Sequence, residues 1–467
     1  MCDIVYLEQN TLLKEVDMMK KCKVFVPFGA LGGGIRQEAF QNAMRLKPDI
    51  ISTDAGSTDS GPYYLGTGKG KYARKAVQRD MELILTAAHE AGIPVTIGTA
   101  GTCGSDSGVD EFAEIAVEIA RKHGFSMKLA KIYTEQSPEE MKSRFAAGKI
   151  HPMEGAPKIS PETFDTCSHI VALAGMEPFK EALSNGADVV ICGRATDTAV
   201  IAAFPLMKGC DPAATWHAAK TAECGGVCTT DVEGGVFLTI DETGFTVESP
   251  SPEGSCSAFG ISAHLLYENA DPVCLTEPGI VIDTSKSVYT ELGDGKVRVE
   301  GTTIEYRPYT MKLEGSGPAG FQTVSIVGIQ DRDVMKDPMT WIRTMQDYVQ
   351  KKLDAFGLDR SRYSYSIRPY GYNAVTGTAV PKGFVPNELA IMLLVTAETQ
   401  ELATQVAKVF NPYLLHFPVH PERPMPSFAF PFSPIECERG QLYSFRLYHL
   451  VELDDPLELC RIVYEEV

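Results

Sequence analysis

The chain has 467 residues, of which 44% are hydrophobic and 22% charged, and its formal net charge is −18. This length exceeds what a single hydrophobic core supports, so we expect two or three domains. The acidic balance argues against nucleic acid or an anionic membrane as a partner. The N-terminus lacks the pattern of a secretory signal and no apolar run reaches the length of a membrane span, which predicts a cytoplasmic protein.

The number and spread of the cysteines predict that their thiols are reduced. Twelve of them are spread over the chain, too thinly for a disulfide scaffold, so we expect most of them to be buried. Cys224 and Cys228 stand four residues apart in a glycine-rich stretch, near Cys210, but no C-x-x-C pair accompanies them. Without such a pair, this spacing is a weak zinc signal.

From Lys23 onward, short apolar segments alternate with helical patterns such as 71–90 and 109–123. The strand-like segments are KVFVPFGA from Lys23, DIISTD from Asp49, PVTIGTA from Pro94, SMKLAKIYT from Ser126, HIVALAG from His169 and ADVVICGRATD from Ala187. This alternation predicts an α/β domain over residues 1–235, with a parallel sheet covered by helices on both faces. The pattern leaves open whether the sheet is open or barrel-like.

The pattern changes after Gly235, where a hairpin is predicted to turn at 242–244 and later strands mix with a few helices. This mixture predicts an α+β domain over residues 236–467, which we expect to serve assembly or to close the cleft. Its Pro-rich segment 418–434 contains three phenylalanines. That segment either packs across a domain or subunit boundary or forms an extended surface connection.

A polar loop after the second predicted strand carries most of the functional signal. Residues 49–70 read DIISTDAGSTDSGPYYLGTGKG, and a helical pattern follows at once. In an α/β domain this order places the loop at the carboxyl end of a strand, where ligands bind. The alternative is a long surface loop with Asx turns. The catalytic candidates here are Asp54, Ser57 and Asp59, and the substrate-binding candidates are Ser60, Tyr63 and Tyr64.

Three more glycine-rich loops stand at predicted strand ends: GALGGGIRQ, GTAGTCGSDSG and GRATDTA. Glycine lets the backbone approach a ligand, and the N–H groups that open a helix attract anions. If the loops converge, they form a cleft for a carboxylate, phosphate or enolate; singly, each is an ordinary strand-to-helix turn. The first loop has dinucleotide-fingerprint spacing but no suitable acidic partner, so we do not expect NAD. Its substrate-binding candidates are Gly33, Gly34 and Arg36.

The two remaining loops supply charged and thiol candidates. Arg194 follows an apolar strand, where it needs a partner and could hold a carboxylate or phosphate, while Asp197 orients the ligand or caps the next helix. Cys103 and Asp106 precede a helix. A thiol there can be a nucleophile, but a structural or cleft-lining Cys103 and a capping Asp106 are the alternatives. Both residues are substrate-binding candidates.

Other acid–base candidates lie in loops further along the chain. Glu223 stands in a glycine-rich turn and is a general-base candidate. His151 and Glu154 could act as acid and base, joined by His169, although a loop histidine is more often structural. A metal-assisted variant would gather Asp54, Asp59 and either His151 or Glu154 around Mg²⁺ or Mn²⁺.

The chain resembles the acyclic terpene utilisation (AtuA) family, formerly a domain of unknown function. The matching residues are GGGIR at 32–36, DAGSTDSGPYYLGTG at 54–68, ADVVICGRATDTA at 187–199 and the C-terminal region from Glu436. TIGTAGTCG occupies the place of the Asn-Ala-Gly-Gly stretch of the founding members, so the chain resembles a divergent branch. The resemblance implies a cytoplasmic catabolic protein acting on an acyl-CoA or a branched hydroxy acid. Some relatives are found with a small partner protein, so the resemblance also allows a hetero-complex.

Two functional hypotheses follow. The first is a lyase or hydro-lyase for a small branched hydroxy-carboxylate or its CoA thioester, with Asp54 or Asp59 as base, the glycine-rich loops as oxyanion site and Arg194 as carboxylate anchor. We expect such an enzyme to be a homo-oligomer. The second is a non-catalytic or partner-dependent subunit whose cleft binds the same ligand.

Overall fold

A computed structural model describes residues 21–266, 269, 271–419, 422 and 428–467. The chain forms two compact units: unit 1 comprises residues 1–317 and 445–467, and unit 2 comprises residues 318–444. Of the Pro-rich segment 418–434, residues 420, 421 and 423–427 lie outside the described residues.

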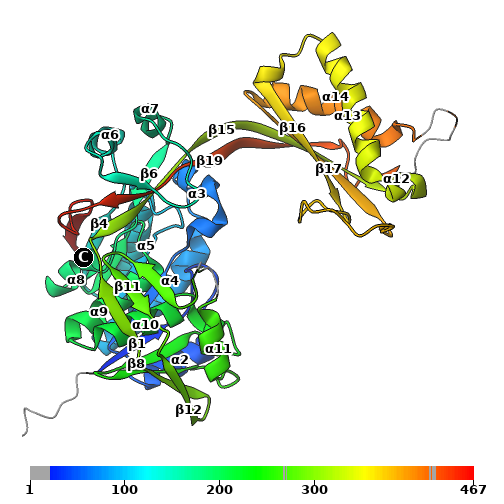
Figure 1. Cartoon of the computed structure of the whole chain (residues 1–467). Helices are drawn as coiled ribbons and strands as arrows, with labels where there is room; N and C mark the ends of the chain where they lie inside the picture. The colour runs from blue at the N-terminus through cyan, green and yellow to red at the C-terminus, as the bar shows by residue number, and fades with distance from the viewer. Residues whose placement is uncertain (1–20, 267–268, 270, 420–421, 423–427) are drawn as a thin grey trace, which may run out of the picture. The chain divides into compact units, whose positions relative to one another are not determined.

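Unit 1 contains an open ten-stranded sheet (Figure 1). In spatial order its strands are β12 (Val288–Gly293), β13 (Lys296–Glu300), β9 (Gly244–Glu248), β8 (Val236–Ile240), β1 (Cys22–Val26), β2 (Ile50–Asp54), β3 (Val95–Gly98), β7 (Val189–Cys192), β4 (Lys128–Tyr133) and β20 (Arg461–Glu466). The five strands from β1 to β4 in this order pair in parallel, and the flanking strands pair antiparallel. The predicted parallel sheet is confirmed, and it is not a barrel.

Helices cover both faces of the parallel strands, because successive residues of a strand point to opposite faces. The first face packs on α8 (Glu177–Ser184), α9 (Asp197–Lys208) and α10 (Pro212–Ala222); the second packs on α2 (Gln37–Arg45), α4 (Arg74–Ala91) and α5 (Asp106–His123). In β7, Val190 and Cys192 belong to the first core, while Val189 and Ile191 belong to the second. Strands buried on both faces explain why the sequence shows continuous apolar runs.

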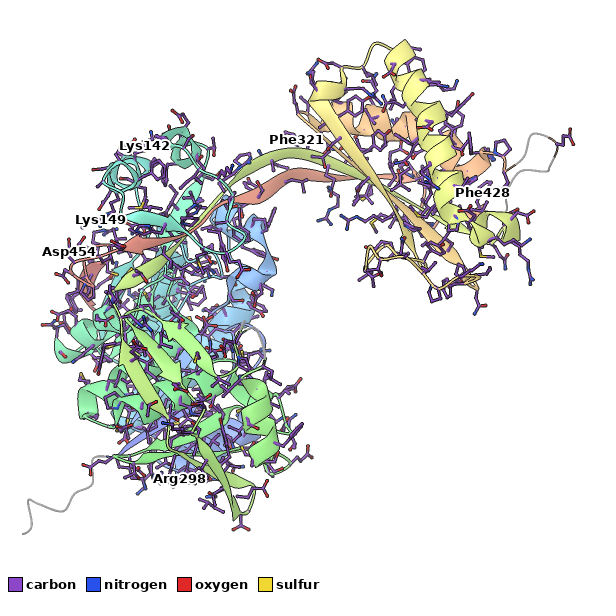
Figure 2. The ribbon with its side chains drawn as sticks, in the orientation of Figure 1. Lys142, Lys149, Arg298, Phe321, Phe428 and Asp454 are labelled. Carbon is purple, nitrogen blue, oxygen red and sulfur yellow. The ribbon has the colours of Figure 1, made fainter. Side chains whose placement is uncertain are left out.

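The expected boundary at residue 235 falls inside unit 1. Gly235 has a positive φ of 71° and leads directly into β8, which pairs antiparallel with β1 from Val26↔Val236 to Cys22↔Ile240. The predicted hairpin of β8 and β9 is therefore an extension of the first sheet. Strand β13 adds the next strand by pairing antiparallel with β9, and its Arg298, labelled in Figure 2, binds Asp241 just after β8 through two 2.8 Å contacts.

Smaller elements complete unit 1. They are η1 (Thr58–Ser60), α3 (Pro62–Thr67), α6 (Pro138–Ala146), β5 (Ile150–Pro152), α7 (Pro161–Asp165), β6 (His169–Ala172), η2 (Gly225–Cys228), α11 (Ala258–His264), β10 (Cys274–Glu277), β11 (Ile280–Asp283) and β14 (Thr303–Tyr306). Helix α6 begins after a capping serine, where Ser137 Oγ accepts a hydrogen bond from Glu140 N. Strands β10, β11 and β14 form a separate three-stranded antiparallel sheet.

Two long neighbouring strands have residues in both units: β15 (Thr310–Ile329) and β19 (Glu436–Glu452). Within unit 1, β15 pairs with β6 and β19 with β5; within unit 2, β15 pairs with β17, where Phe321 lies opposite Ala397 (Figure 2). The Nζ of Lys149, just before β5, lies 2.6 Å from the Oδ2 of Asp454, just after β19.

Unit 2 is an antiparallel sheet packed against helices. Its further elements are α12 (Arg332–Lys336), α13 (Pro338–Ala355), η3 (Arg360–Arg362), β16 (Tyr363–Tyr370), β17 (Leu389–Ala397), α14 (Gln400–His416) and β18 (Phe428–Ala429). Every second residue of β17 points into the core that α13 and α14 cover. Among the described residues of the chain, no helix is both long and apolar enough to cross a lipid bilayer.

Candidate active site

A cavity of about 380 Å³ lies in unit 1 where three of the predicted loops meet. Its wall comprises residues from the ends of β1 and β2, from the start of α9 and from the turn after α10. The lining residues are Phe28, Gly29, Ala30, Asp54, Gly56, Ser57, Asp59, Ser60, Lys71, Tyr72, Asp197, Glu223, Cys224, Val227, Val232 and Glu233. The carboxyl ends of adjacent parallel strands share one sheet edge, which explains this convergence.

Asp54 ends β2 and is 4% exposed. Its Oδ2 accepts a hydrogen bond from Gly56 N at 2.8 Å, whereas its Oδ1 accepts none from the described residues. Gly56 has a φ of 136°, and a Cβ there would collide with Thr102. Burial raises the pKa of Asp54 to about 7, although the Gly56 N–H and the charge of Arg194 oppose the rise. Asp54 is therefore a carboxyl group that gains and loses a proton near neutral pH.

Asp197 and Glu223 line the same cavity in different electrostatic settings. Burial, and then the charges of Asp54 and Glu223, hold the pKa of Asp197 well above its usual range. Glu223 accepts a hydrogen bond from Thr198 Oγ1 at 2.7 Å and lies 3.0 Å from Lys220 Nζ. The predicted helix cap is corrected: Thr196 caps α9 by accepting from Ala199 N, and Asp197 is the first helical residue.

The rest of the second loop divides between the cavity and a short helix. Ser57 Oγ donates to Asp59 Oδ2 at 3.1 Å, and Ser60 Oγ accepts from Lys71 Nζ at 2.9 Å. Lys71 is the one basic side chain among the described residues that line the cavity, and our sequence reasoning missed it. The tyrosine pair lies on α3, edge to face, and is not among the lining residues.

The first loop binds a carboxylate of the chain itself. The N–H groups of Gly32 and Gly34 both donate to Asp80 Oδ2, each at 3.0 Å. Gly33 stands between them, and Arg36 pairs with Asp231 and Glu233. These contacts explain the glycines of the loop by internal structure; Gly33, Gly34 and Arg36 are not lining residues.

Arg194 has a buried partner. Its Nε lies 3.3 Å from Glu314 Oε2, and the two side chains are 3% and 2% exposed. Lys312 Nζ contacts the other oxygen of Glu314 at 2.6 Å. The expectation that this arginine needs a partner is met by β15 of the same unit, and Arg194 is not among the lining residues.

The third loop and the histidine candidates lie outside the cavity wall. Cys103 is buried and accepts a hydrogen bond from Ser105 Oγ, while Asp106 begins α5 and lies 3.2 Å from Arg461. His169 contacts Glu135 at 2.6 Å, which raises the pKa of its ring. His151 pairs with Glu452 on the surface.

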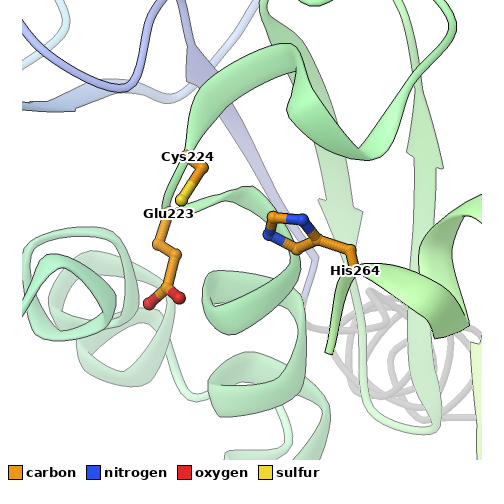
Figure 3. Close-up of side chains that lie close together, drawn as sticks. All are labelled: Glu223, Cys224 and His264. Carbon is orange, nitrogen blue, oxygen red and sulfur yellow. The ribbon is translucent and has the colours of Figure 1, made fainter. Parts of the chain in front are cut away.

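Two lining residues, Glu223 and Cys224, belong to a second group of side chains that could bind a metal ion. A carboxylate oxygen of Glu223, the Sγ of Cys224 and a ring nitrogen of His264 all lie within 4.8 Å of one another (Figure 3). Within the described residues this is the group of acidic, thiol and imidazole side chains that meets that distance; Asp54 and Asp59 form none with His151 or Glu154. His264, the last residue of α11, carried no sequence signal because 40 residues separate it from Cys224.

Two larger hollows, of about 660 and 840 Å³, lie in unit 2. The first is lined by residues at the ends of β15, β16 and β17 and by β18, and the second lies along α14. The described residues of their walls include no buried carboxylate. The smaller cavity in unit 1 is therefore the stronger candidate site.

A family model described as "Acyclic terpene utilisation family protein AtuA" matches residues 57–423. A comparison with curated proteins and a comparison with solved structures each returned no match. The family match begins in the loop after β2 and extends past α14, so it covers most of the chain.

Proposed function

This chain belongs to the AtuA family of acyclic terpene utilisation proteins, and on that premise we propose that it is a lyase or hydro-lyase acting on a branched hydroxyacyl thioester. The observation that carries the proposal is Asp54, a buried carboxyl group with a pKa of about 7 in the wall of a polar cavity. A general base works best when its pKa lies near the working pH.

Two carboxyl groups with different environments supply an acid and a base. In a hydro-lyase reaction, Asp54 takes the proton next to the thioester carbonyl, and the electron pair of that C–H bond forms the new C=C bond. The C–O bond of the β-hydroxyl breaks, and its oxygen leaves as water with a proton from Asp197. The raised pKa of Asp197 supports its role as the proton donor.

The charge of the wall favours a thioester over a free acid. The carboxylates of Asp59, Glu223 and Glu233 line the cavity together with the raised-pKa carboxyl groups of Asp54 and Asp197, against the single basic residue Lys71. A free carboxylate at the reacting carbon would be repelled, whereas a thioester carbonyl is neutral. Lys71 supports the enolate that develops when the proton leaves. A cavity of about 380 Å³ accommodates the acyl group, and the coenzyme remains outside.

Ligand binding is tested first, by thermal shift with branched hydroxyacyl-CoA thioesters and the matching free acids. A ligand at about a hundred times its dissociation constant adds roughly 2.7 kcal/mol to the stability. We expect stabilisation by thioesters. No shift with any of the compounds would contradict the proposal and favour a partner-dependent subunit.

Turnover of the stabilising thioester is then followed through the ultraviolet absorbance of the conjugated enoyl product. We expect Asp54→Asn to lower kcat by at least about 100-fold, the usual contribution of a general base. Asp188→Asn is the matched control, because Asp188 is exposed at the opposite end of the sheet, before β7. Wild-type rates in folded Asp54→Asn would remove Asp54 from the mechanism.

A further inference from the structure

Three side chains of the type that bind metals come together from two distant segments. Glu223 and Cys224 follow α10, and His264 ends α11. One oxygen, one sulfur and one nitrogen atom lie within 4.8 Å of one another, and Figure 3 shows the His264 ring on another segment, opposite Glu223 and Cys224. Ligand atoms around a tetrahedral ion with bonds of about 2.0–2.3 Å are roughly 3.5 Å apart. Side-chain rotations that shorten the distances between the oxygen, sulfur and nitrogen atoms to that value would let all three bind one ion.

We propose that Glu223, Cys224 and His264 bind a divalent ion of the zinc type, with its fourth position open to the cavity. A thiolate and an imidazole together select a borderline-soft ion such as Zn²⁺ and disfavour Mg²⁺, which prefers oxygen ligands. Three protein ligands and one open position are typical of catalytic zinc sites, whereas structural sites have four. This donor set differs from the Mg²⁺ or Mn²⁺ site that the sequence suggested.

Neighbouring groups hold the Glu223 carboxylate in place. Thr198 Oγ1 donates to its Oε2 at 2.7 Å, and Lys220 Nζ lies 3.0 Å from its Oε1. Each carboxylate oxygen has two lone pairs, so it can accept a hydrogen bond and still bind an ion. Hydrogen bonds of this kind commonly orient metal-binding carboxylates.

The cavity side of the cluster suits a cation. Glu223 and Cys224 both line the cavity, so an ion that they hold is accessible from it. The same wall contains Asp54, which is 4% exposed and whose Oδ1 accepts no hydrogen bond from the described residues. A divalent ion offsets the negative charge of this wall. A role for the ion in polarising the thioester carbonyl rests on the proposed function, but its binding does not.

The test uses the untagged full chain, stripped with a chelator and then titrated with Zn²⁺ against a chromophoric competitor. Co²⁺ is loaded in parallel, because a thiolate bound to Co²⁺ produces a sulfur-to-metal charge-transfer band in the near ultraviolet. We expect one ion per chain and this band. Neither measurement requires turnover, so failure of the lyase hypothesis leaves the result readable.

The variants Cys224→Ser and His264→Gln are expected to weaken Zn²⁺ binding by more than about tenfold, and the first also removes the charge-transfer band. The matched controls Cys274→Ser and His151→Gln replace exposed residues outside the cluster and are expected to bind as the wild type does. Circular dichroism melts verify folding. A wild-type Co²⁺ spectrum without the band, or wild-type Zn²⁺ affinity in either folded cluster variant, would overturn the site.

Discussion

The two units differ in how completely their buried polar side chains are hydrogen-bonded. In unit 2, Ser325 donates to Asn411 at 2.8 Å, and Gln350 donates to the Tyr363 hydroxyl at 3.1 Å. Within its described residues, no buried side-chain oxygen or nitrogen lacks a hydrogen-bond partner. Unit 1 buries charged groups instead, and Asp54 Oδ1 is left without a hydrogen bond among the described residues. Buried polar atoms are usually hydrogen-bonded, so a buried carboxyl oxygen that lacks a hydrogen bond and has a shifted pKa at a cavity makes Asp54 a candidate functional residue.

Unit 1 also contains a buried charge that is paired, and this gives the largest expected effect. We expect Arg194→Met to lower the stability by about 3 kcal/mol, because Glu314 would stay buried with Lys312 as its remaining partner. Urea denaturation measures the loss. The double variant Arg194→Met/Glu314→Leu should recover most of it. A loss below about 1 kcal/mol in the single variant would contradict a stabilising role for the Arg194–Glu314 pair.

The paired polar groups of unit 2 give the next effect. Asn411→Ala leaves the Ser325 hydroxyl without its acceptor and should cost about 1–3 kcal/mol, with no change in ligand binding by unit 1. Asn387→Ala, at an exposed position, is the control. Loss of the thioester-induced thermal shift in folded Asn411→Ala would contradict the expectation that unit 1 binds the ligand independently of this hydrogen bond in unit 2.

The third effect is opposite in sign. The folded pKa of Asp54, about 7, lies above its unfolded value, so the stability that this group contributes is complete in acid and is lost as the pH rises through about 7. Asp197, whose pKa is also raised, and Arg194 face it. Asn cannot ionise, so Asp54→Asn should gain stability over the wild type between pH 5 and pH 8.

At about 1.4 kcal/mol for each unit of pKa difference, we expect this gain to be at least about 1 kcal/mol. Melting curves of both proteins at each pH provide the measurement. A difference that does not change with pH would mean that Asp54 has an ordinary pKa, and it would then resemble the exposed Asp188.

Sequence periodicity predicted the parallel strands because each of them is buried on both faces, which leaves a continuous apolar run such as Val189–Cys192. Strand order was not predictable, since it depends on contacts between distant segments. No local pattern shows that β7 lies between β3 and β4. For the same reason, the glycines at 234 and 235 indicated a domain boundary where the chain only turns back along β1.

The candidate site was predictable where residues follow strands directly, as Asp54 follows β2, because the direction of a parallel strand fixes which edge its loop reaches. Arg194 also follows a strand, and Asp106 is the first residue of a helix. Both nevertheless pair with side chains that only the fold brings near. Lys71 and His264 needed the fold as well. One points back to the cavity from beyond α3, and the other arrives from a helix 40 residues after Cys224.

The position of β20 has a consequence for folding during synthesis of the protein. Lys131 on β4 contacts Glu465 on β20, and the two are 334 positions apart in the sequence, so this edge of β4 has no strand to pair with until β20 has been synthesised. At about 5–20 residues per second, a ribosome needs roughly 20–70 s to cover that interval. An unpaired edge is a template for aggregation. Nascent chains are therefore most in need of a chaperone during that period, and truncation before Arg461 would make the exposure permanent.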